Sequence, residues 1–229
     1  MVAAFGQILS REILELPKFG CVNIHASLLP KYRGAAPIQW AVIDGVEKTG
    51  ITIQQMNEGV DTGDILLQKE YYLAQDETGA SLFDRLCDLG SEAIVEAISK
   101  IEEGSIVPVK QDESEATHAK MLTKSMGEID FENEAAVIER LVRGLNSWPR
   151  AYTYYKGKTM KIWRANVVSL DKNEVNPGTV VAKDKESFTV VCGKDAIQIL
   201  EIQPEGKRRM SVRDFMLGCK IELGEKLGN

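Results

Sequence analysis

The stretch CVNIHASLLPKYRGAAP, residues 21–37, decides the fold of this chain. It begins with a short apolar run, CVNIH, which predicts a buried parallel strand. Side chains alternate along a strand, so Asn23 and His25 project from the same face. In open α/β sheets, ligands bind at the carboxyl ends of the strands. The stretch therefore predicts an α/β sheet with a ligand site where this strand enters a loop punctuated by proline and glycine.

The residues on either side continue a pattern of strands and helices. The expected strands are residues 2–5, 21–25, 50–58 and 65–73, and the expected helices are residues 10–18, 37–44 and 81–101. We interpret residues 1–104 as part of a Rossmann-like catalytic domain with a mostly parallel sheet. Because only one strand precedes residue 21, the strand 21–25 would lie near an unprotected edge. We therefore expect the natural protein to extend upstream, with its first strands missing from this chain.

The second half of the chain has a different pattern. Residues 105–125 are polar and lack clear periodicity, so we interpret them as a linker. A helix is expected over residues 133–145. Short segments rich in Val, Ile, Thr and aromatic residues then follow, separated by Gly and Asp turns. This pattern is typical of a small closed barrel, and it predicts an OB-like β-barrel domain over residues 126–229.

Charge is divided unevenly between the two halves. The net charge is −6, which taken alone argues against a nucleic-acid binder. Residues 1–125 carry 11 Lys and Arg against 19 Asp and Glu, a net of −8, whereas residues 126–229 carry 17 against 15, a net of +2. A basic module that meets a polyanion would explain this asymmetry, and a solvated surface of mixed charge explains it equally well.

Two further classes of protein are disfavoured. No stretch of about 18 apolar residues is present, so no membrane span is expected. The four cysteines, Cys21, Cys87, Cys192 and Cys219, are scattered without Cys-x-x-Cys or Cys/His spacing. This spacing predicts reduced thiols in a cytosolic protein and argues against a zinc site or a disulfide framework, so we expect no metal.

The candidate catalytic side chains are few. Of the two histidines, His118 lies in the polar segment EATHAK and is best interpreted as a surface residue, whereas His25 ends an apolar strand. On this pair alone, a structural role for His25 is an equally good interpretation. Asp61 lies in the turn GVDTGD, where it is either a turn residue or a catalytic carboxylate carried on a tight, glycine-flanked backbone.

A longer motif joins these three residues. The stretch NIHASLLPKYRGAAPIQWAVIDGVEKTGITIQQMNEGVDTGDIL, residues 23–66, closely resembles the signature of the tetrahydrofolate-dependent formyltransferases. In that family an Asn-x-His at a strand end, followed by S-L-L-P-x-Y-R-G, pairs with the Asp of an M-x-x-G-x-D-T-G loop. Here these are Asn23, His25 and Asp61. The resemblance continues through residues 145–165 to residues 205–228, so it covers essentially the whole chain.

The resemblance implies a mechanism. Transfer of a formyl group from N10 of 10-formyltetrahydrofolate to an amine passes through a tetrahedral oxyanion. Asn23 would donate its amide N–H to that oxygen, and His25 would stabilise it further. Asp61 would orient His25, favour its cationic form and relay a proton through water. The residues expected to line the folate site are Phe5, Gly6, Gln7, Ile8, Leu9, Ser27, Leu28, Leu29, Pro30, Gly59 and Val60.

The resemblance also implies the acceptor. Residues 126–229 look like the OB-like barrel appended in methionyl-tRNA formyltransferases, so the expected acceptor is the amino group of methionyl-initiator tRNA. The expected enzyme acts in translation initiation in the cytoplasm, as a monomer when full length. We expect its tRNA phosphates to meet Lys156, Lys158, Lys161, Lys207, Arg208 and Arg209. The chain departs from the family at its start, because the family's catalytic domain begins further upstream, and at Arg150, where many relatives carry glycine.

Other acceptors stay open. An amino-sugar nucleotide formyltransferase carries a similar barrel, and the motif alone does not separate it from an enzyme that acts on tRNA. Glycinamide ribonucleotide enzymes generally lack such a barrel, so residues 126–229 weigh against them. A formyl-folate hydrolase would use water instead of an amine. The remaining alternative is an inactive fragment that retains only RNA binding.

Overall fold

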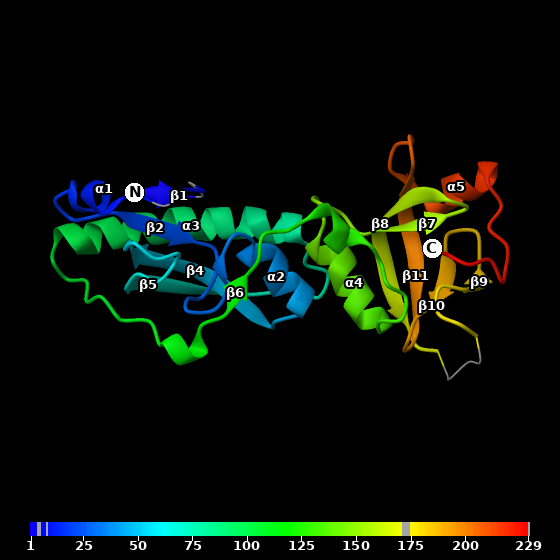
Figure 1. The fold of residues 1–229 in the computed structure, drawn as a ribbon, viewed down its shortest axis with the longest axis horizontal. Coiled ribbons are helices and arrows are strands. Elements are labelled where there is room, and N and C mark those ends of the chain that lie inside the picture. Colours follow the sequence, from blue (N-terminus) through cyan, green and yellow to red (C-terminus); the bar gives the residue numbers. More distant parts are fainter. Residues whose placement is uncertain (4–5, 8, 171–174, 229) are drawn as a thin grey trace. The chain divides into compact units, whose positions relative to one another are not determined.

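The computed structural model describes residues 1–3, 6–7, 9–170 and 175–228 (Figure 1). The chain forms two compact units, Met1–Leu122 and Thr123–Asn229. The first unit combines helices with a small sheet. The second unit is built mainly from antiparallel strands. The predicted order, an α/β unit followed by a β unit, is confirmed. No helix within the described part of the chain is both long and apolar enough to cross a membrane.

The sheet of the first unit has four strands in the order β1-β2-β4-β5. They are β1 (Val2–Ala3), β2 (Val22–His25), β4 (Lys48–Gln55) and β5 (Ile65–Tyr72). Strands β1 and β2 are parallel, whereas β2–β4 and β4–β5 are antiparallel. The expectation of a mostly parallel sheet is therefore corrected for these strands. Residues 56–64 connect β4 to β5 without a helix, because neighbouring antiparallel strands need no long crossover.

Three helices accompany this sheet: α1 (Arg11–Glu15), α2 (Pro37–Asp44) and α3 (Gly79–Glu102). Helix α2 starts with Pro37 in its first turn and ends at Gly45, which adopts the left-handed conformation with φ 69°. Helix α3 starts at Thr78, whose side chain exchanges hydrogen bonds with Ser81 in a capping box. The extents of α2 and α3 are close to the predicted residues 37–44 and 81–101.

The two faces of the sheet differ in chemistry. One face carries Ile24, Ile51 and Ile53, which pack against α3. Helix α3 comes very close there, because a Cβ on Gly90 would stand 3.2 Å from Ile24 Cγ2. Ladder partners on the other face are polar: Asn23 lies opposite Gln54, and His25 lies opposite Thr52. The hydrophobic core therefore fixes the sheet from one side and leaves the polar face for a site.

The segment that follows α3 also belongs to the first unit. We name residues 109–119 the strap. Val109 and Ile65 exchange backbone hydrogen bonds of 2.8 and 2.7 Å, and β6 (His118–Ala119) pairs in parallel with β3 (Arg33–Gly34). A short 3-10 helix, Glu113–Glu115, lies between these two attachments. Much of the expected linker, residues 105–125, is thus packed onto the sheet unit and contains its own elements.

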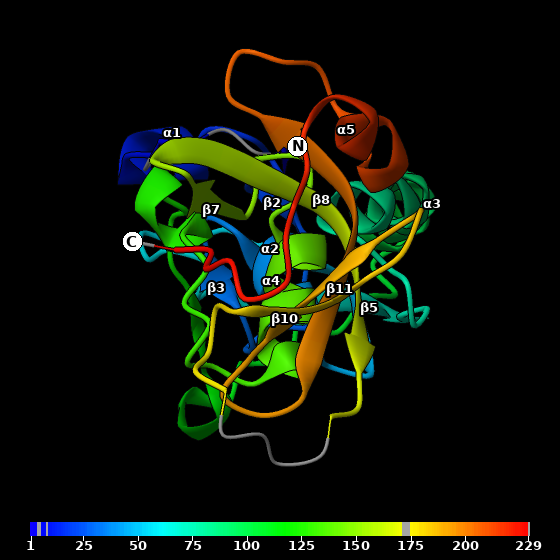
Figure 2. The same ribbon diagram turned by 90° about the vertical axis from the view of Figure 1, so that its right-hand side faces the viewer.

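The second unit is a curled antiparallel sheet with strand order β7-β8-β11-β10-β9 and β12 paired to β11 (Figure 2). Its strands are β7 (Tyr152–Tyr155), β8 (Lys158–Val168), β9 (Val180–Lys183), β10 (Phe188–Val191), β11 (Ala196–Pro204) and β12 (Met210–Ser211). Its helices are α4 (Ala135–Gly144) and α5 (Val212–Gly218).

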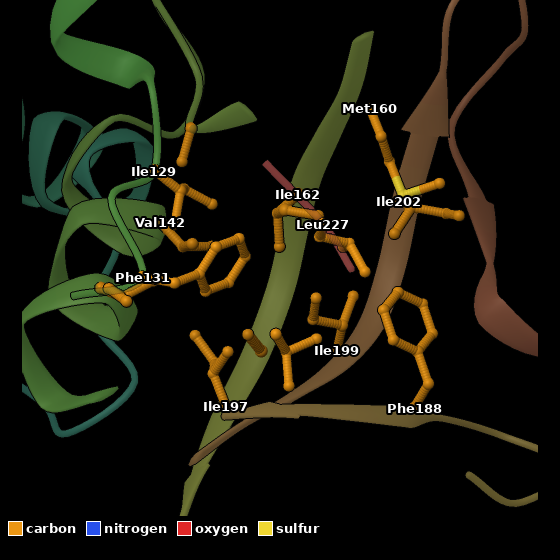
Figure 3. Packing of buried hydrophobic residues seen from close by; sticks show 14 of the residues in the cluster. Ile129, Phe131, Val142, Met160, Ile162, Phe188, Ile197, Ile199, Ile202 and Leu227 are labelled. Atoms are coloured by element: carbon orange, nitrogen blue, oxygen red, sulfur yellow. The ribbon is translucent and has the colours of Figure 1, made fainter. Parts of the chain in front are cut away.

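The core of this unit lies between α4 and the concave face of the sheet (Figure 3). Helix α4 contributes Ile138 and Val142, and the preceding segment contributes Phe131. Strand side chains that alternate inward, such as Ile162 and Ile199, meet them. Burying each of these large aliphatic or aromatic groups contributes about 1.5–3 kcal/mol to folding.

The described ladders leave the sheet open between β7 and β9, so a barrel closed by strands alone is not what forms. Residues 224–228 span this opening. On one side the Val180 N–H donates to Glu225 O and the Leu227 N–H donates to Gly178 O, both at 2.8 Å. On the other side the Gly228 N–H donates to Tyr154 O at 2.9 Å. An irregular C-terminal segment therefore completes the barrel.

Candidate active site

His25 ends β2 and is 6% exposed. Its Nε2 lies 2.9 Å from the backbone oxygen of Tyr32, and its Nδ1 lies 3.5 Å from Asp61 Oδ2. A carbonyl oxygen only accepts hydrogen bonds, so Nε2 carries the hydrogen of this contact. Nδ1 then faces the Asp61 carboxylate.

Asp61 lies in the turn between β4 and β5 and has φ 54°, in the left-handed region. Its Oδ1 accepts a hydrogen bond from Gln54 Nε2 at 2.8 Å, and its Oδ2 accepts one from the Gly34 N–H at 2.9 Å. Both carboxylate oxygens therefore accept hydrogen bonds from groups other than His25. The turn itself is tight, because a Cβ on Gly63 would stand 1.6 Å from Gln55 O.

Asn23 shares the polar face of the sheet with His25, as the sequence predicted. Its ladder partner is Gln54, the residue that holds Asp61 Oδ1. Among the described residues, the Asn23 side chain has no hydrogen-bonding partner, whereas His25 and Asp61 are both engaged. The structure therefore brings the three predicted residues to one face and leaves the Asn23 amide available to a ligand.

The loop after β2 is fastened to the same face. Thr52 Oγ1 accepts a hydrogen bond from the Leu29 N–H at 3.0 Å and donates to Ser27 O at 2.7 Å. Gln68 Nε2 donates to Leu29 O and to Thr52 Oγ1, both at 2.9 Å. The predicted wall residues Ser27 and Leu29 are consequently buried, with 0% and 3% exposure. Ser27 and Leu29 therefore support the loop beside the polar face of the sheet.

The other predicted folate residues lie at the same edge of the sheet or in the Asp61 turn. Because β1 and β2 are parallel, Gly6, Gln7 and Leu9 follow β1 at the edge where His25 ends β2. Gly59 and Val60 are exposed in the turn that carries Asp61. Leu28 packs against Gly50, and Pro30 is partly buried. Phe5 and Ile8 lie outside the described residues.

The predicted tRNA-binding cations gather at one end of the second unit. The β7–β8 turn carries Lys156 and the loop between β11 and β12 carries Lys207 to Arg209; the Glu205 N–H joins these turns by donating to Thr159 O at 2.9 Å. Two of the six cations have partners within the chain. Lys156 Nζ lies 2.8 Å from Glu225 Oε1, and Arg209 bonds Glu201 while its guanidinium stacks on Trp163 at 4.5 Å.

Arg150 now has a structural account. Its φ is 77°, a left-handed conformation that glycine adopts without strain. This conformation explains why glycine suits the position that follows Trp-Pro. Here the guanidinium lies 4.2 Å from the centroid of the Trp163 ring, and that of Arg209 lies 4.5 Å from the same centroid. A cation over an aromatic ring makes a favourable contact.

Sequence reasoning missed the residues that hold the site together. Thr52, Gln54 and Gln68 fasten the loop and the Asp61 carboxylate, and Gln111 bonds the backbone of the Asp61 turn. A local signal existed for Thr52 and Gln54, because they alternate with isoleucines in the buried strand GITIQQ. No local signal existed for Gln111. His118, as expected, is exposed.

Beside the site, the Tyr32 phenol is hydrogen-bonded to the Asp44 carboxylate. Burial, and then the hydrogen bond to Asp44, raise the pKa of the Tyr32 phenol. The Tyr32 side chain therefore stays neutral and donates to Asp44 Oδ2 at 2.9 Å.

Over residues 1–3, 6–7, 9–170 and 175–228, no three His, Cys, Asp or Glu side chains gather in a group that could hold a metal ion.

Comparison with known proteins places the chain in a family. Residues 1–98 match the family model described as formyl transferase, and residues 121–220 match that of the formyl transferase C-terminal domain. A methionyl-tRNA formyltransferase of Lachnospira eligens is 52% identical over 100% of this chain and 74% of its own length. The chain belongs to the methionyl-tRNA formyltransferase family. A second methionyl-tRNA formyltransferase, from Caldanaerobacter subterraneus subsp. tengcongensis, is 50% identical over 98% of this chain and 72% of its own length.

Solved structures share the fold at lower identity. HypX from Aquifex aeolicus in complex with tetrahydrofolic acid superposes with a TM-score of 0.64 at 19% identity, over 89% of this chain and 38% of that one. An N-formyltransferase from Helicobacter canadensis, in complex with folinic acid and dTDP-3-aminofucose, gives a TM-score of 0.63 at 19% identity, over 80% of this chain and 65% of that one. These similarities support the arrangement of an α/β unit followed by a barrel-like unit in methionyl-tRNA formyltransferases.

Proposed function

We propose that this chain transfers the formyl group of 10-formyltetrahydrofolate to the amino group of methionyl-initiator tRNA, in the cytoplasm. The observation that carries this proposal is the level of identity, about half of all residues, to methionyl-tRNA formyltransferases across both units of the chain. The chain spans about three quarters of the length of these two relatives. Similarity across both units favours them over the sugar formyltransferases, whose likeness is one of fold.

In the proposed reaction the acceptor amine attacks the formyl carbon of the donor. A carbon–nitrogen bond to the acceptor forms, the bond to N10 breaks, and one proton moves from the amine to N10. The tetrahedral intermediate carries negative charge on the former carbonyl oxygen. A preorganised donor aimed at that oxygen stabilises the transition state by about 3–4 kcal/mol. Asn23 is the proposed donor, because its side chain lies on the polar face without a partner among the described residues.

His25 and Asp61 have complementary proposed roles. His25 Nε2 already donates to Tyr32 O, and Nδ1 faces Asp61 at 3.5 Å. We infer that His25 acts on the oxyanion through the positive charge of its ring. Asp61 stabilises that charge, fixes the orientation of the ring and, through water, relays the proton from the amine to N10.

The donor is proposed to lie over the edge of the sheet between the segment after β1 and the Asp61 turn. Gly6, Gln7, Leu9, Gly59 and Val60 offer backbone groups there, and buried Ser27 and Leu29 support the floor. The acceptor tRNA is proposed to lie along the cationic end of the second unit. Lys158, Lys161, Lys207 and Arg208 form no ion pair among the described residues, so they are the first candidates for phosphate contacts.

The test is an acceptor comparison. Incubate the chain with 10-formyltetrahydrofolate and one of three acceptors: methionyl-initiator tRNA, a dTDP-3-amino sugar or water alone. Mass spectrometry of the methionine released from the tRNA should show N-formylmethionine. Formylated sugar in place of formylmethionine would reassign the acceptor, and formate release alone would identify a hydrolase. Loss of product in the His25→Ala variant, with product retained in His118→Ala, ties the activity to the proposed site.

A further inference from the structure

The turn that carries Asp61 is tied to a side chain far along the chain. Gln111, in the strap, donates from Nε2 to two backbone oxygens of this turn: Asp61 O at 2.8 Å and Gly63 O at 2.7 Å. Both hydrogens of the Gln111 amide are thereby used on the turn. The bond to Asp61 O acts on the main chain of the residue whose carboxylate faces His25.

The acceptor end of the same amide is also fixed. Gln111 Oε1 accepts from Arg33 Nε at 3.0 Å and from Arg33 Nη2 at 2.8 Å. The Arg33 side chain is 3% exposed, and its remaining contacts go to Glu113, at 2.9 and 2.8 Å. Rotating the amide by half a turn would set its N–H groups against a guanidinium and its oxygen against two carbonyls. Gln111 therefore has one orientation that satisfies every partner.

Arg33 joins this cluster to the other side of Asp61. It lies in β3, which pairs with β6 of the strap, and its N–H donates to Thr117 O at 2.9 Å. The next residue, Gly34, donates from its N–H to Asp61 Oδ2. The backbone at Gly34 is itself pressed against the strap, because a Cβ there would stand 2.8 Å from Ala119 O. The strap thus contacts the Asp61 main chain directly, through Gln111, and its pairing with β3 positions the Gly34 N–H that bonds the Asp61 carboxylate.

We propose that Gln111, oriented by Arg33 and Glu113, is a positioning residue that holds Asp61 against His25. A non-glycine residue at positive φ persists only where its surroundings hold it, at a cost of order 1–3 kcal/mol. Asp61 has φ 54°, and Gln111 is the side chain that bonds its carbonyl oxygen. The inference rests on the proposed function, because it assigns Gln111 to the catalysis of that reaction.

The central variant is Gln111→Glu. A glutamate has the same shape and still accepts from Arg33, so the strap keeps its anchor. It has no N–H to give to Asp61 O or Gly63 O, and its charge opposes both carbonyls. We expect kcat to fall roughly 10- to 100-fold, the range for a small misplacement of a reacting group. KM for donor and for tRNA should stay within about two-fold of wild type.

A second readout does not depend on activity. The chain has two histidines, and they report on different places: His25 on the site and His118 on the strap. In ring-resonance NMR spectra of Gln111→Glu, the His25 signals should move while those of His118 stay. Glu115→Gln is the matched control and should change neither. Glu115 lies on the same strap, and its side chain pairs with Lys31 alone among the described residues, at 3.9 Å.

The outcomes separate the two proposals. Unchanged His25 signals, or full kcat in Gln111→Glu, overturn the positioning role, whether or not the acceptor is tRNA. A wild-type chain with no formyl transfer overturns the proposed function, while the NMR comparison still decides on Gln111. If the NMR signals of both histidines move in Gln111→Glu, the same spectra are recorded for Gln111→Met. This variant removes the hydrogen bonds without adding charge. Movement of His118 there too would show that Gln111 holds the strap and not the turn.

Discussion

At the residue scale, Asn23 and His25 differ in how far the chain itself satisfies them. Both ring nitrogens of His25 already have contacts, to Tyr32 O and to Asp61. Asn23 shares the face without a partner among the described residues. Catalysis by differential binding needs a donor that gains a partner in the transition state. Asn23 is therefore the proposed oxyanion donor, whereas the role proposed for His25 depends on its fixed position beside Asp61.

Replacing these residues should therefore lower turnover far more than binding. We expect His25→Ala to reduce kcat by roughly 10²–10⁴, the range for a lost acid or base. Asn23→Ala should cost roughly 10²–10³, as for a lost oxyanion donor. Steady-state kinetics with methionyl-tRNA measure both. His118→Ala is the control. If kcat falls in His118→Ala and not in His25→Ala, the assignment is wrong.

Asp61→Asn tests charge and hydrogen bonding together. The amide loses the negative charge that faces His25. It also sets an NH₂ group against either the Gly34 N–H or Gln54 Nε2, both of which are donors. We expect kcat to fall by a factor similar to that of His25→Ala, in the same steady-state assay. Asp61→Asn that keeps most of its turnover would contradict a role for the carboxylate.

At the element scale, the first residues of β8 and the β11–β12 loop present the cations proposed to meet tRNA. Replacing Lys158, Lys161, Lys207 and Arg208 with alanine should weaken initiator tRNA binding. It should also flatten the dependence of log K on log salt by about one unit for each phosphate that the variant no longer binds. Titrations at low and high salt measure this slope. Lys156→Ala and Arg209→Ala are matched controls, because these two side chains are already paired with Glu225 and Glu201.

The C-terminal segment that completes the barrel should make stability depend on pH. Hydrogen bonds from Lys156 and then from Tyr155 lower the pKa of Glu225 from its ordinary 4.5 to about 2. A depressed carboxyl pKa adds stability above its unfolded value, and this gain disappears as pH falls from about 4.5 to about 2. At neutral pH, Glu225→Gln should lower the free energy of unfolding by about 1 kcal/mol, the order expected for a partly exposed ion pair. A glutamine can still accept the hydrogen bonds that Tyr155 Oη and the Glu222 N–H donate to Glu225.

Urea denaturation across this pH range is the measurement. The difference between wild type and Glu225→Gln should shrink as the pH is lowered. The exposed Glu132→Gln supplies the control. A difference that stays constant down to pH 3 would show that the carboxylate charge is not what stabilises this segment.

At the scale of the whole molecule, each unit has its own core. The second unit draws its core from residues between Ile129 and Leu227, and the first from residues between Val22 and Ala97. We expect residues 123–229 expressed alone to unfold in one cooperative transition, because an independent core is what defines a domain. Circular dichroism during thermal unfolding is the measurement. A non-cooperative loss of signal would mean that this unit needs the rest of the chain.

The sequence predicted well whatever depends on local periodicity. Helix α3 follows from its apolar spacing, and Asn23 and His25 share a face because strand alternation is local. The sheet was predicted to be mostly parallel, whereas β2–β4 and β4–β5 are antiparallel. A hydrophobic run does not record which way its neighbour points. The strap was mistaken for a linker because its contacts are remote: Gln111 and Arg33 are 78 positions apart. A polar segment that bonds to backbone carbonyls leaves no hydrophobic pattern to detect.

The tightness of the Asp61 turn has a consequence for sequence change. A methyl group on Gly63 would collide with the main chain at Gln55, 1.6 Å away, and rigid backbone cannot move aside cheaply. In a library of all single replacements selected for formylating activity, position 63 should therefore tolerate as little as position 61, although glycine has no reactive group. Gly50 should behave likewise, because a Cβ there would stand 2.1 Å from Lys69 O. The positions that tolerate no replacement in such a library would therefore include closely packed glycines as well as the proposed catalytic residues.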